Sequence, residues 1–462
     1  MKYISTRGTA PVLDFEGAMM SGLARDGGLY LPQHFPTFSA EDLRSLRGKP
    51  FAEVAFAVAR RFVGGVIPDD QLKPIIDLAY STFSHDSITP LKQLGSNLFL
   101  LELFHGPTIA FKDVAMQLIV HLMDWSLARR NHRIVVLAAT SGDTGGAAVE
   151  AFRHSTQADL FVLFPEGRVS DVQRRQMTTV NSSAVTNFAI KGNFDDCQNI
   201  VKALFNDHKF RDEVHLAGVN SINWARVMAQ VSYYIFAGVG LGAPERKVSF
   251  TVPTGNFGNV FAGLVAKRMG LPIDRLVIAT NANDILDRTL KSGRYEVTGV
   301  VATSSPSMDI QVSSNFERLV YLASNRNPEA VVRAMAGLKQ SGSFILENAA
   351  LQSIRHEFDS GRASEAETSA TMKAVLATTG ELLDPHTAVG VHVAQHHMGN
   401  SPMVVLATAH PAKFPDAVQK ATGINPELPA KLKGLMERPE SFTLLPNSAG
   451  AVKSLILEKQ KR

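Results

Sequence analysis

Short and almost wholly apolar runs, rich in β-branched residues, recur through the central and C-terminal parts of the chain. Each run has the length of a strand buried on both faces and ends at a polar or glycine-containing loop. These runs cover residues 134–139, 160–164, 249–253, 276–279 and 403–407. Segments with apolar residues at helical spacing lie between them, for example residues 111–128, 225–236 and 260–268. Buried strands that alternate with helices predict an α/β fold with parallel sheets.

The chain up to about residue 85 has a different pattern, in which apolar residues recur at helical spacing. Residues 40–46 and 51–62 are each predicted to form a helix, and Asp69 is placed to cap a third one. Gly64 and Gly65 separate the second helix from the third. The pattern therefore predicts a small, mainly helical leading domain.

Hydrophobic residues make up 45% of the 462 residues, which is enough to bury at least one large core. The chain has no uncharged apolar stretch of about 18 residues, and its N-terminus lacks the apolar run of a secretory signal. A membrane span is therefore not expected, and a cytoplasmic location is. The single cysteine, Cys197, excludes a disulfide within the chain and is predicted to be an inert, buried thiol.

The net charge of +4 is small for this length, and no dense patch of Lys and Arg with interleaved aromatic residues occurs. Nucleic-acid binding therefore has little support. A metal site is not expected either, because the adjacent His396 and His397 point to different faces of any regular element and no metal-binding motif occurs. The lack of a Gly-x-Ser-x-Gly motif argues against a serine hydrolase.

Lys112 stands where a glycine- and proline-containing loop, residues 105–110, turns into an apolar helix. A lysine that enters a buried site in this way is rarely an ordinary surface cation. Desolvated beside an aldehyde cofactor, its amine can form a Schiff base and later transfer protons.

Two glycine-containing loops follow predicted strands and open helices. The first offers the hydroxyls of Ser141 and Thr144 and the amides of a helix N-terminus, which suits a carboxylate or a phosphate. The second, residues 253–260, contains Gly255 and Gly258, whose backbone freedom lets successive N–H groups converge on phosphate oxygens. Each loop also has a plain structural explanation, a helix cap for the first and a turn for the second.

A third segment places Thr408 at the end of the last apolar run, with His410 and Lys413 after it. Polar residues at the carboxyl ends of parallel strands face the ligand crevice in such folds. His410 is more simply explained as a histidine satisfied at the start of a helix than as a catalytic base. The sequence Asp-Pro-His at residues 384–386 is likewise explained by helix initiation.

Together and in this order, the segments resemble the threonine synthase family. That family belongs to the fold-type II pyridoxal-phosphate enzymes, with tryptophan synthase β and the serine/threonine dehydratases. The resemblance spans nearly the whole chain and is also carried by stretches typical of the family's leading domain and of its long bacterial and fungal-type branch. These stretches are residues 21–32 (SGLARDGGLYLP), 220–226 (NSINWAR), 307–310 (SMDI) and 314–318 (SNFER).

The resemblance implies an α/β fold with two parallel-sheet lobes, of the tryptophan-synthase-β-like type, preceded by a helical N-terminal domain. On this basis we expect residues 1–88 to form the N-terminal domain and residues 89–430 to form the cofactor-binding core. The smaller lobe of the core is expected at roughly residues 113–235. Residues 431–462 are expected to form a helical extension packed on the core.

The resemblance also assigns roles at matching positions. Lys112 matches the lysine that forms a Schiff base with pyridoxal 5′-phosphate, and Thr408 matches the hydroxyl residue beside the pyridine nitrogen. The loop that holds the cofactor phosphate matches Gly255, Asn256, Phe257, Gly258 and Asn259. The loop that faces the substrate carboxylate and the phenolic oxygen of the cofactor matches Ser141, Gly142, Asp143 and Thr144.

Asp143 departs from many relatives, which carry Asn there. An amide can donate to a phenolate and a carboxylate cannot, so three arrangements stay open: a protonated carboxyl, a bridging water, or a side chain turned away. Arg226 and Lys413 are expected to bind the substrate phosphate, on charge type and motif position. A surface or supporting role is the alternative for each of these two cations.

The family's reaction converts O-phospho-L-homoserine and water into L-threonine and phosphate. The resemblance therefore implies a carbon–oxygen lyase of threonine biosynthesis that acts on this small molecule. Two alternatives stay open: a serine/threonine dehydratase with the same cofactor, and a non-catalytic paralogue that binds a phosphorylated metabolite. The sequence does not indicate the oligomeric state.

Overall fold

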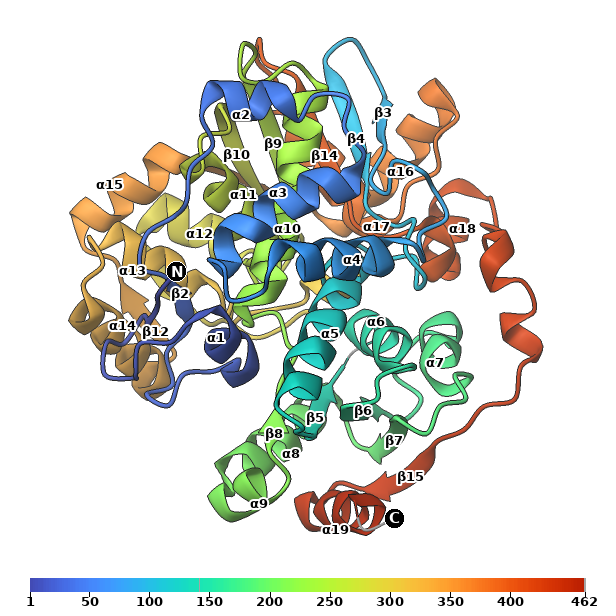
Figure 1. The fold of residues 1–462 in the computed structure, drawn as a ribbon. Coiled ribbons are helices and arrows are strands. Elements are labelled where there is room, and N and C mark those ends of the chain that lie inside the picture. Colours follow the sequence, from blue (N-terminus) through green and yellow to red (C-terminus); the bar gives the residue numbers. More distant parts are fainter. Residues whose placement is uncertain (141, 461–462) are drawn as a thin grey trace.

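The computed structural model describes residues 1–140 and 142–460, and its larger sheet has six strands. They are β3 (Leu91–Gln93), β4 (Leu98–Glu102), β9 (Val248–Pro253), β10 (Ile273–Thr280), β13 (Phe358–Arg362) and β14 (Met403–Ala407). Their order across the sheet is β13-β10-β9-β14-β4-β3, and all neighbours are parallel except β3 and β4. This sheet lies in the upper part of Figure 1.

The smaller sheet has five parallel strands and lies in the lower part of Figure 1. They are β5 (Ile134–Ala139), β6 (Ala158–Pro165), β7 (Val185–Lys191), β8 (Leu216–Ala217) and β15 (Thr443–Pro446). Their order is β15-β7-β6-β5-β8. The other strands of residues 1–140 and 142–460 form short antiparallel pairs: β1 (Tyr3–Ser5) with β2 (Tyr30–Pro32), and β11 (Arg294–Glu296) with β12 (Ser343–Ile345).

The helices lie in three successive stretches of the chain. The N-terminal part contains α1 (Phe15–Ser21), α2 (Ala40–Ser45), α3 (Phe51–Val63) and α4 (Asp69–Tyr80). Next come α5 (Lys112–Arg129), α6 (Asp143–Phe152), α7 (Asp171–Thr178), α8 (Phe194–Asn206) and α9 (His208–Glu213). The remainder are α10 (Trp224–Gly240), α11 (Gly258–Arg268), α12 (Ile285–Ser292), α13 (Phe316–Ala323), α14 (Pro328–Ser341), α15 (Asn348–Glu357), α16 (Glu365–Thr379), α17 (Pro385–Gln395), α18 (Pro415–Thr422) and α19 (Ala449–Gln460). In the described part of the chain, the 3₁₀ turns are η1 (Pro306–Met308), η2 (Pro411–Lys413), η3 (Ala430–Leu432) and η4 (Leu435–Glu437).

The strands and helices predicted from apolar patterns agree with the structure to within a few residues. Asp69 is an exception, because it is the first residue of α4 and the capping position is Pro68, which forms no side-chain cap. The predicted helical extension at the C-terminus also differs, because it contains β15, which pairs in parallel with β7. Pairing covers an edge of the smaller sheet that would otherwise present unbonded N–H and C=O groups.

The N-terminal part is packed tightly on the larger lobe. Trp224 of α10 is buried, and its ring lies 6.0 Å from that of Tyr3 and 5.6 Å from that of Phe62. The buried guanidinium of Arg318 lies over the same ring and donates hydrogen bonds to the Tyr30 and Ile222 carbonyl oxygens. Arg318 therefore joins the leading domain to the core.

Among the described residues, no helix has the length and apolar character needed to cross a membrane.

The carboxyl ends of β4, β9 and β14 in one sheet and β5 in the other lead into the four segments with candidate site residues. An isolated bridge between Ala110 and Ala409 joins the loop after β4 to the segment after β14. Ligands in parallel α/β folds bind at such carboxyl ends. The fold therefore brings the four segments to one region between the two sheets.

Candidate active site

Lys112 is the first residue of α5, and its side chain is buried. The loop before it is tied down by the buried Asp113 carboxylate, which accepts hydrogen bonds from the Thr108 N–H at 2.9 Å and the Thr108 hydroxyl at 2.6 Å. Ile109, within this loop, has a φ of 55°, a conformation that β-branched residues rarely adopt. Strained backbone of this kind persists where surrounding bonds hold it, often at functional sites. Here it fixes the direction from which Lys112 enters the site.

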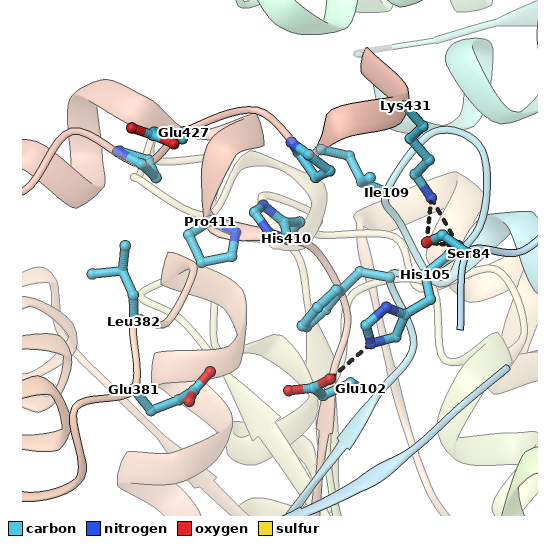
Figure 2. A pocket seen from close by; sticks show the side chains of 13 residues that line it. Ser84, Glu102, His105, Ile109, Glu381, Leu382, His410, Pro411, Glu427 and Lys431 are labelled. Atoms are coloured by element: carbon cyan, nitrogen blue, oxygen red, sulfur yellow. Dashed lines mark hydrogen bonds and ion pairs between the residues drawn. The ribbon is translucent and has the colours of Figure 1, made fainter. Parts of the chain in front are cut away.

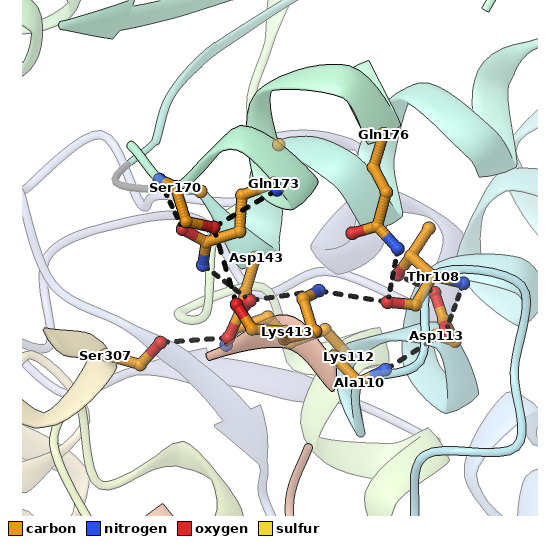
Figure 3. Close-up of polar contacts among 12 residues, drawn as sticks. Thr108, Ala110, Lys112, Asp113, Asp143, Ser170, Gln173, Gln176, Ser307 and Lys413 are labelled. Atoms are coloured by element: carbon orange, nitrogen blue, oxygen red, sulfur yellow. Dashed lines mark hydrogen bonds and ion pairs between the residues drawn. The ribbon is translucent and has the colours of Figure 1, made fainter. Parts of the chain in front are cut away.

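Asp143 lies at the centre of the site, where it accepts from four side chains (Figure 3). Its Oδ2 lies 3.1 Å from Lys112 Nζ, and its Oδ1 lies 3.0 Å from Lys413 Nζ. Gln173 Nε2 donates to Oδ1 at 2.9 Å, and the Ser307 hydroxyl donates to Oδ2 at 3.0 Å. These donors come from α5, η2, α7 and η1, so one carboxylate joins segments from both lobes.

The two lysine ammonium groups beside Asp143 favour its ionised form. Burial alone would raise the pKa of its carboxyl, but the Lys112 and Lys413 ammonium groups hold that pKa well below its usual range. Burial lowers the pKa of the Lys112 amine, an effect that Asp143 opposes and Lys413 strengthens. Asp143 is directed into the site between the two lysine amines, so the turned-away arrangement does not match the structure, and this pairing favours the ionised carboxylate over the protonated carboxyl.

The loop after β9 has the backbone expected of a close-fitting ligand loop. Phe257 has a φ of 65°, in the left-handed region, and α11 begins at the next residue. A Cβ added to Gly255 would lie 2.8 Å from the carbonyl oxygen of Ser307, so a side chain cannot be placed there without a shift. The Asn256 carbonyl oxygen accepts from both the backbone and the side-chain amide of Asn315. These contacts fix the loop next to the segment that carries Ser307.

The side-chain amide of Asn259 provides this loop with an unpaired hydrogen-bond donor. Its Oδ1 accepts hydrogen bonds from the hydroxyls of Tyr233 at 2.6 Å and Tyr234 at 2.9 Å, which sets the orientation of the amide. Its buried Nδ2 has no partner among the described residues. A buried donor without an acceptor costs roughly 1–3 kcal/mol, so this position suits a bound anion such as a phosphate.

Arg226 carries a second buried donor without a partner, and this donor belongs to a cation. It is buried in α10, donates from Nη1 to the Val219 carbonyl oxygen at 2.9 Å, and has an unpaired Nε. Within residues 1–140 and 142–460, no carboxylate forms an ion pair with it, and burial lowers its pKa to about 10. A buried cation without a counter-ion is costly, so the geometry favours an anionic ligand here as well.

The remaining predicted residues lie at the edges of this cluster. Thr408 directly follows β14 and is buried, and its carbonyl oxygen accepts from the Phe111 N–H at 2.8 Å. Gly142 has a φ of 140°, and a Cβ on it would lie 2.4 Å from the Gln173 amide. Thr144 is half-buried in the first turn of α6. Ser141 lies outside the described residues.

Three residues of the cluster were not identified from the sequence: Gln173, Ser307 and His386. Ser307 lies in the stretch 307–310, which contributed to the family resemblance without receiving a role. His386 was explained by helix initiation, yet its Nε2 accepts the Ser307 N–H at 3.2 Å. Gln173 lies in a capping box of α7, a pattern that by itself indicates only a helix start. No local pattern marks any of the three as neighbours of Asp143.

A separate cavity of about 400 Å³ lies beside the Lys112 loop (Figure 2). Ile109 and His410 line it, but Lys112 and Asp143 do not. The His410 Nδ1 accepts from the Ala412 N–H at 3.2 Å, and burial lowers the pKa of the ring to about 4. His410 is thus a satisfied histidine at the start of η2, in agreement with the simpler explanation of the sequence.

Comparison with known proteins places the whole chain in one set of relatives. A family model described as "Threonine synthase N terminus" matches residues 2–80, "Pyridoxal-phosphate dependent enzyme" matches residues 83–409, and "Threonine synthase, C-terminal" matches residues 387–456. A threonine synthase of Pseudomonas aeruginosa is 50% identical over 100% of this chain and 99% of its own length. The threonine synthase of Saccharomyces cerevisiae is 44% identical over 91% of this chain and 88% of its own length.

Solved structures give the same result. A PLP-bound threonine synthase from Brucella melitensis has a TM-score of 0.98 and 59% identity, with 100% of both chains covered. The yeast threonine synthase has a TM-score of 0.94 and 40% identity over 100% of this chain and 99% of its own. A threonine deaminase from Solanum lycopersicum, with a TM-score of 0.53 and 12% identity over 86% of this chain and 98% of its own, shares the fold only.

Proposed function

We propose, from the premise that this chain belongs to the threonine synthase family of pyridoxal-phosphate-dependent enzymes, that it converts O-phospho-L-homoserine and water into L-threonine and phosphate. The observation that carries the proposal is the buried amine of Lys112, paired at 3.1 Å with an ionised Asp143. Ser307 joins this pair to the second glycine-containing loop, because its hydroxyl donates to Asp143 and its carbonyl oxygen lies against Gly255. An amine with a lowered pKa in such a place is suited to act as both a nucleophile and a base.

The side chains present fit pyridoxal 5′-phosphate. The loop from Gly255 to Asn259 offers backbone N–H groups and the unpaired Asn259 Nδ2, and we assign it to the cofactor phosphate. We assign Lys112 to the aldehyde carbon and Thr408 to the pyridine nitrogen. When bound, the cofactor withdraws electrons from the substrate and makes its C–H bonds more acidic. A hydroxyl cannot stabilise a fixed positive charge on the ring nitrogen as a carboxylate can, so Thr408 would moderate this withdrawal.

Lys112 is the group we assign to proton transfer. Its Nζ removes the proton from the α-carbon of the substrate and returns protons later in the reaction. Asp143 stabilises the protonated form of this amine at each step. The amides at the start of α6, with Ser141, Gly142 and Thr144, are assigned to the substrate carboxylate because a helix N-terminus favours anions.

The substrate phosphate needs cations of its own, and we assign Lys413 and Arg226 to it. Lys413 is completely buried, and it lies beside Asp143 and donates to the Thr108 carbonyl oxygen at 3.0 Å. Arg226 supports the assignment through its unpaired Nε and its lack of a described counter-ion.

Replacing Lys413 with methionine is expected to raise the KM for phosphohomoserine by about 10–100-fold, because a charge-assisted hydrogen bond contributes roughly 1.5–3 kcal/mol. The cofactor should remain bound, as measured by the absorbance of the purified variant. Lys420→Met, on the exposed face of α18, serves as the matched control and should keep the normal KM. An unchanged KM in Lys413→Met would remove Lys413 from the substrate site.

Replacing Thr408 with alanine is expected to lower kcat by about 10–100-fold without unfolding the protein, because one hydrogen bond to the cofactor is lost. Thr408→Ser retains the hydroxyl and should keep most of the activity. Steady-state kinetics and thermal melting of the two variants provide the measurement. Equal kinetics for wild type and Thr408→Ala would contradict the pyridine contact.

The proposed reaction is tested directly by mixing the cofactor-loaded protein with phosphohomoserine. Threonine and phosphate should appear in equal amounts. A serine/threonine dehydratase would instead release ammonia and a keto acid from free serine or threonine. A non-catalytic paralogue would bind a phosphorylated metabolite and release neither product.

A further inference from the structure

Asp384 and His386 form a buried pair next to the site. Asp384 caps α17 and accepts from the backbone N–H groups of His386 and Thr387 at 3.0 and 3.1 Å. Its Oδ2 also lies 2.7 Å from His386 Nδ1. On the other side of the ring, Nε2 accepts the Ser307 N–H at 3.2 Å. Since Nε2 accepts, the network places the ring proton on Nδ1, where Asp384 holds it.

Ser307 joins this pair to the catalytic lysine. Its hydroxyl donates at 3.0 Å to Asp143 Oδ2, the same oxygen that lies 3.1 Å from Lys112 Nζ. Its carbonyl oxygen would lie 2.8 Å from a Cβ on Gly255, so the backbone of η1 packs directly against the phosphate loop. The N–H, the carbonyl and the hydroxyl of one serine therefore each meet a different part of the site.

We propose that His386 is a positioning residue for Lys112 and acts through Ser307 and Asp143. The hydrogen bond from the Ser307 N–H to His386 fixes the Ser307 backbone and thereby orients its hydroxyl toward Asp143 Oδ2. The hydrogen bond from that hydroxyl holds Oδ2 in its ion pair with Lys112 Nζ. The inference deepens the proposed function and rests on it for the role of Lys112. Helix initiation accounts for Asp384 but not for a ring nitrogen bonded to a residue 79 positions away.

The rival explanation is purely structural: His386 holds η1 against the phosphate loop, and the Ser307 hydroxyl plays no part. The two explanations differ in whether the effect of His386 passes through that hydroxyl. A double-mutant cycle between His386 and Ser307 separates them, because residues on one path show non-additive effects.

The cycle uses His386→Asn, Ser307→Ala and the double variant, with His386→Gln as the rescue. Asparagine places its amide near the position of Nδ1 and cannot reach the Ser307 N–H, whereas glutamine can present an oxygen near Nε2. His392→Asn, on the same helix, is the matched control. The first readout is the rate at which cofactor-free protein regains its absorbance after pyridoxal phosphate is added, since this needs the Lys112 amine and no substrate. The second is kcat and KM with phosphohomoserine.

We expect His386→Asn and Ser307→Ala each to slow cofactor capture and kcat by about 10–100-fold, since misplacing a reacting group by about 1 Å has this effect. KM should change by less than about threefold. The double variant should be no slower than the slower single variant, and His386→Gln should recover most of the loss. His392→Asn should match wild type.

The inference is overturned if His386→Asn keeps its full effect in the Ser307→Ala background, or if glutamine fails to rescue. If His386→Asn does not fold, normal cofactor capture by Ser307→Ala overturns it equally. Failure of the proposed function would give a different result. The rates of cofactor capture would show the expected non-additive pattern in the four proteins, while no threonine is formed from phosphohomoserine.

Discussion

Lys112→Ala is expected to abolish threonine formation, with a loss in kcat of at least about 10⁴-fold. The substitution removes both the nucleophile that would hold the cofactor and the base that would move protons. The variant should also lack the Schiff-base absorbance near the edge of the visible range that is expected of the loaded wild type. Both effects are measured on purified protein, by product release and by a spectrum after excess cofactor is removed.

Lys112→Arg is the informative control for this prediction. Arginine keeps a positive charge beside Asp143 but remains protonated and cannot act as the nucleophile. We expect it to fold as stably as wild type and to be as inactive as Lys112→Ala. Turnover of Lys112→Ala within about tenfold of wild type would show that another group does the chemistry.

Asp143→Asn is expected to destabilise the cofactor-free protein by about 3 kcal/mol, because Lys112 and Lys413 would then share a buried space without a counter-charge. Denaturant unfolding at neutral pH measures the effect. Gln173→Ala removes only one neutral donor to the same carboxylate and should cost less. An Asp143→Asn variant as stable as wild type would mean that the ion pairs of Asp143 contribute nothing to the free energy of unfolding.

Wild type and Asp143→Asn are also expected to differ in how their stability depends on pH. The folded-state pKa of Asp143 lies well below its usual range, so its contribution to stability is fully present above the unfolded value of about 3.9. That contribution is lost as the pH falls through the folded value. The difference in unfolding free energy between wild type and Asp143→Asn should therefore shrink as the pH falls below about 4. A difference that persists undiminished at lower pH would contradict the assigned charge.

The elements that carry the site were predictable because each is a local pattern. A strand, a glycine-containing loop and a helix follow one another around Gly255, and Lys112 begins a helix directly after a proline-containing loop. Such patterns place residues at the carboxyl ends of strands, and a resemblance to a family then gives them roles. The convergence of the loops follows from the parallel order of the strands, whereas the division into two lobes was implied by the family resemblance.

The cluster around Asp143 was not predictable in the same way. Lys413, Gln173 and Ser307 lie in three segments separated by more than a hundred residues, and no spacing in the sequence says that they share one carboxylate. The three arrangements left open for Asp143 could be narrowed only once those neighbours were known. His386 illustrates a related limit, because helix initiation is a correct but incomplete account of its segment.

Strand β15 was missed for another reason. Thr443–Pro446 is a short and mostly exposed run that ends in proline, so it looks like a loop. Its identity as a strand depends on β7, to which it is joined only through the fold.

This late pairing has a consequence for biosynthesis. A ribosome completes β7 about 250 residues before it reaches β15, so the nascent chain carries an open strand edge while the larger lobe is still being made. At roughly 5–20 residues per second, that interval lasts on the order of 10–50 seconds. Open edges recruit other strands, so this edge of the nascent chain stays open to intermolecular pairing until β15 has left the ribosome.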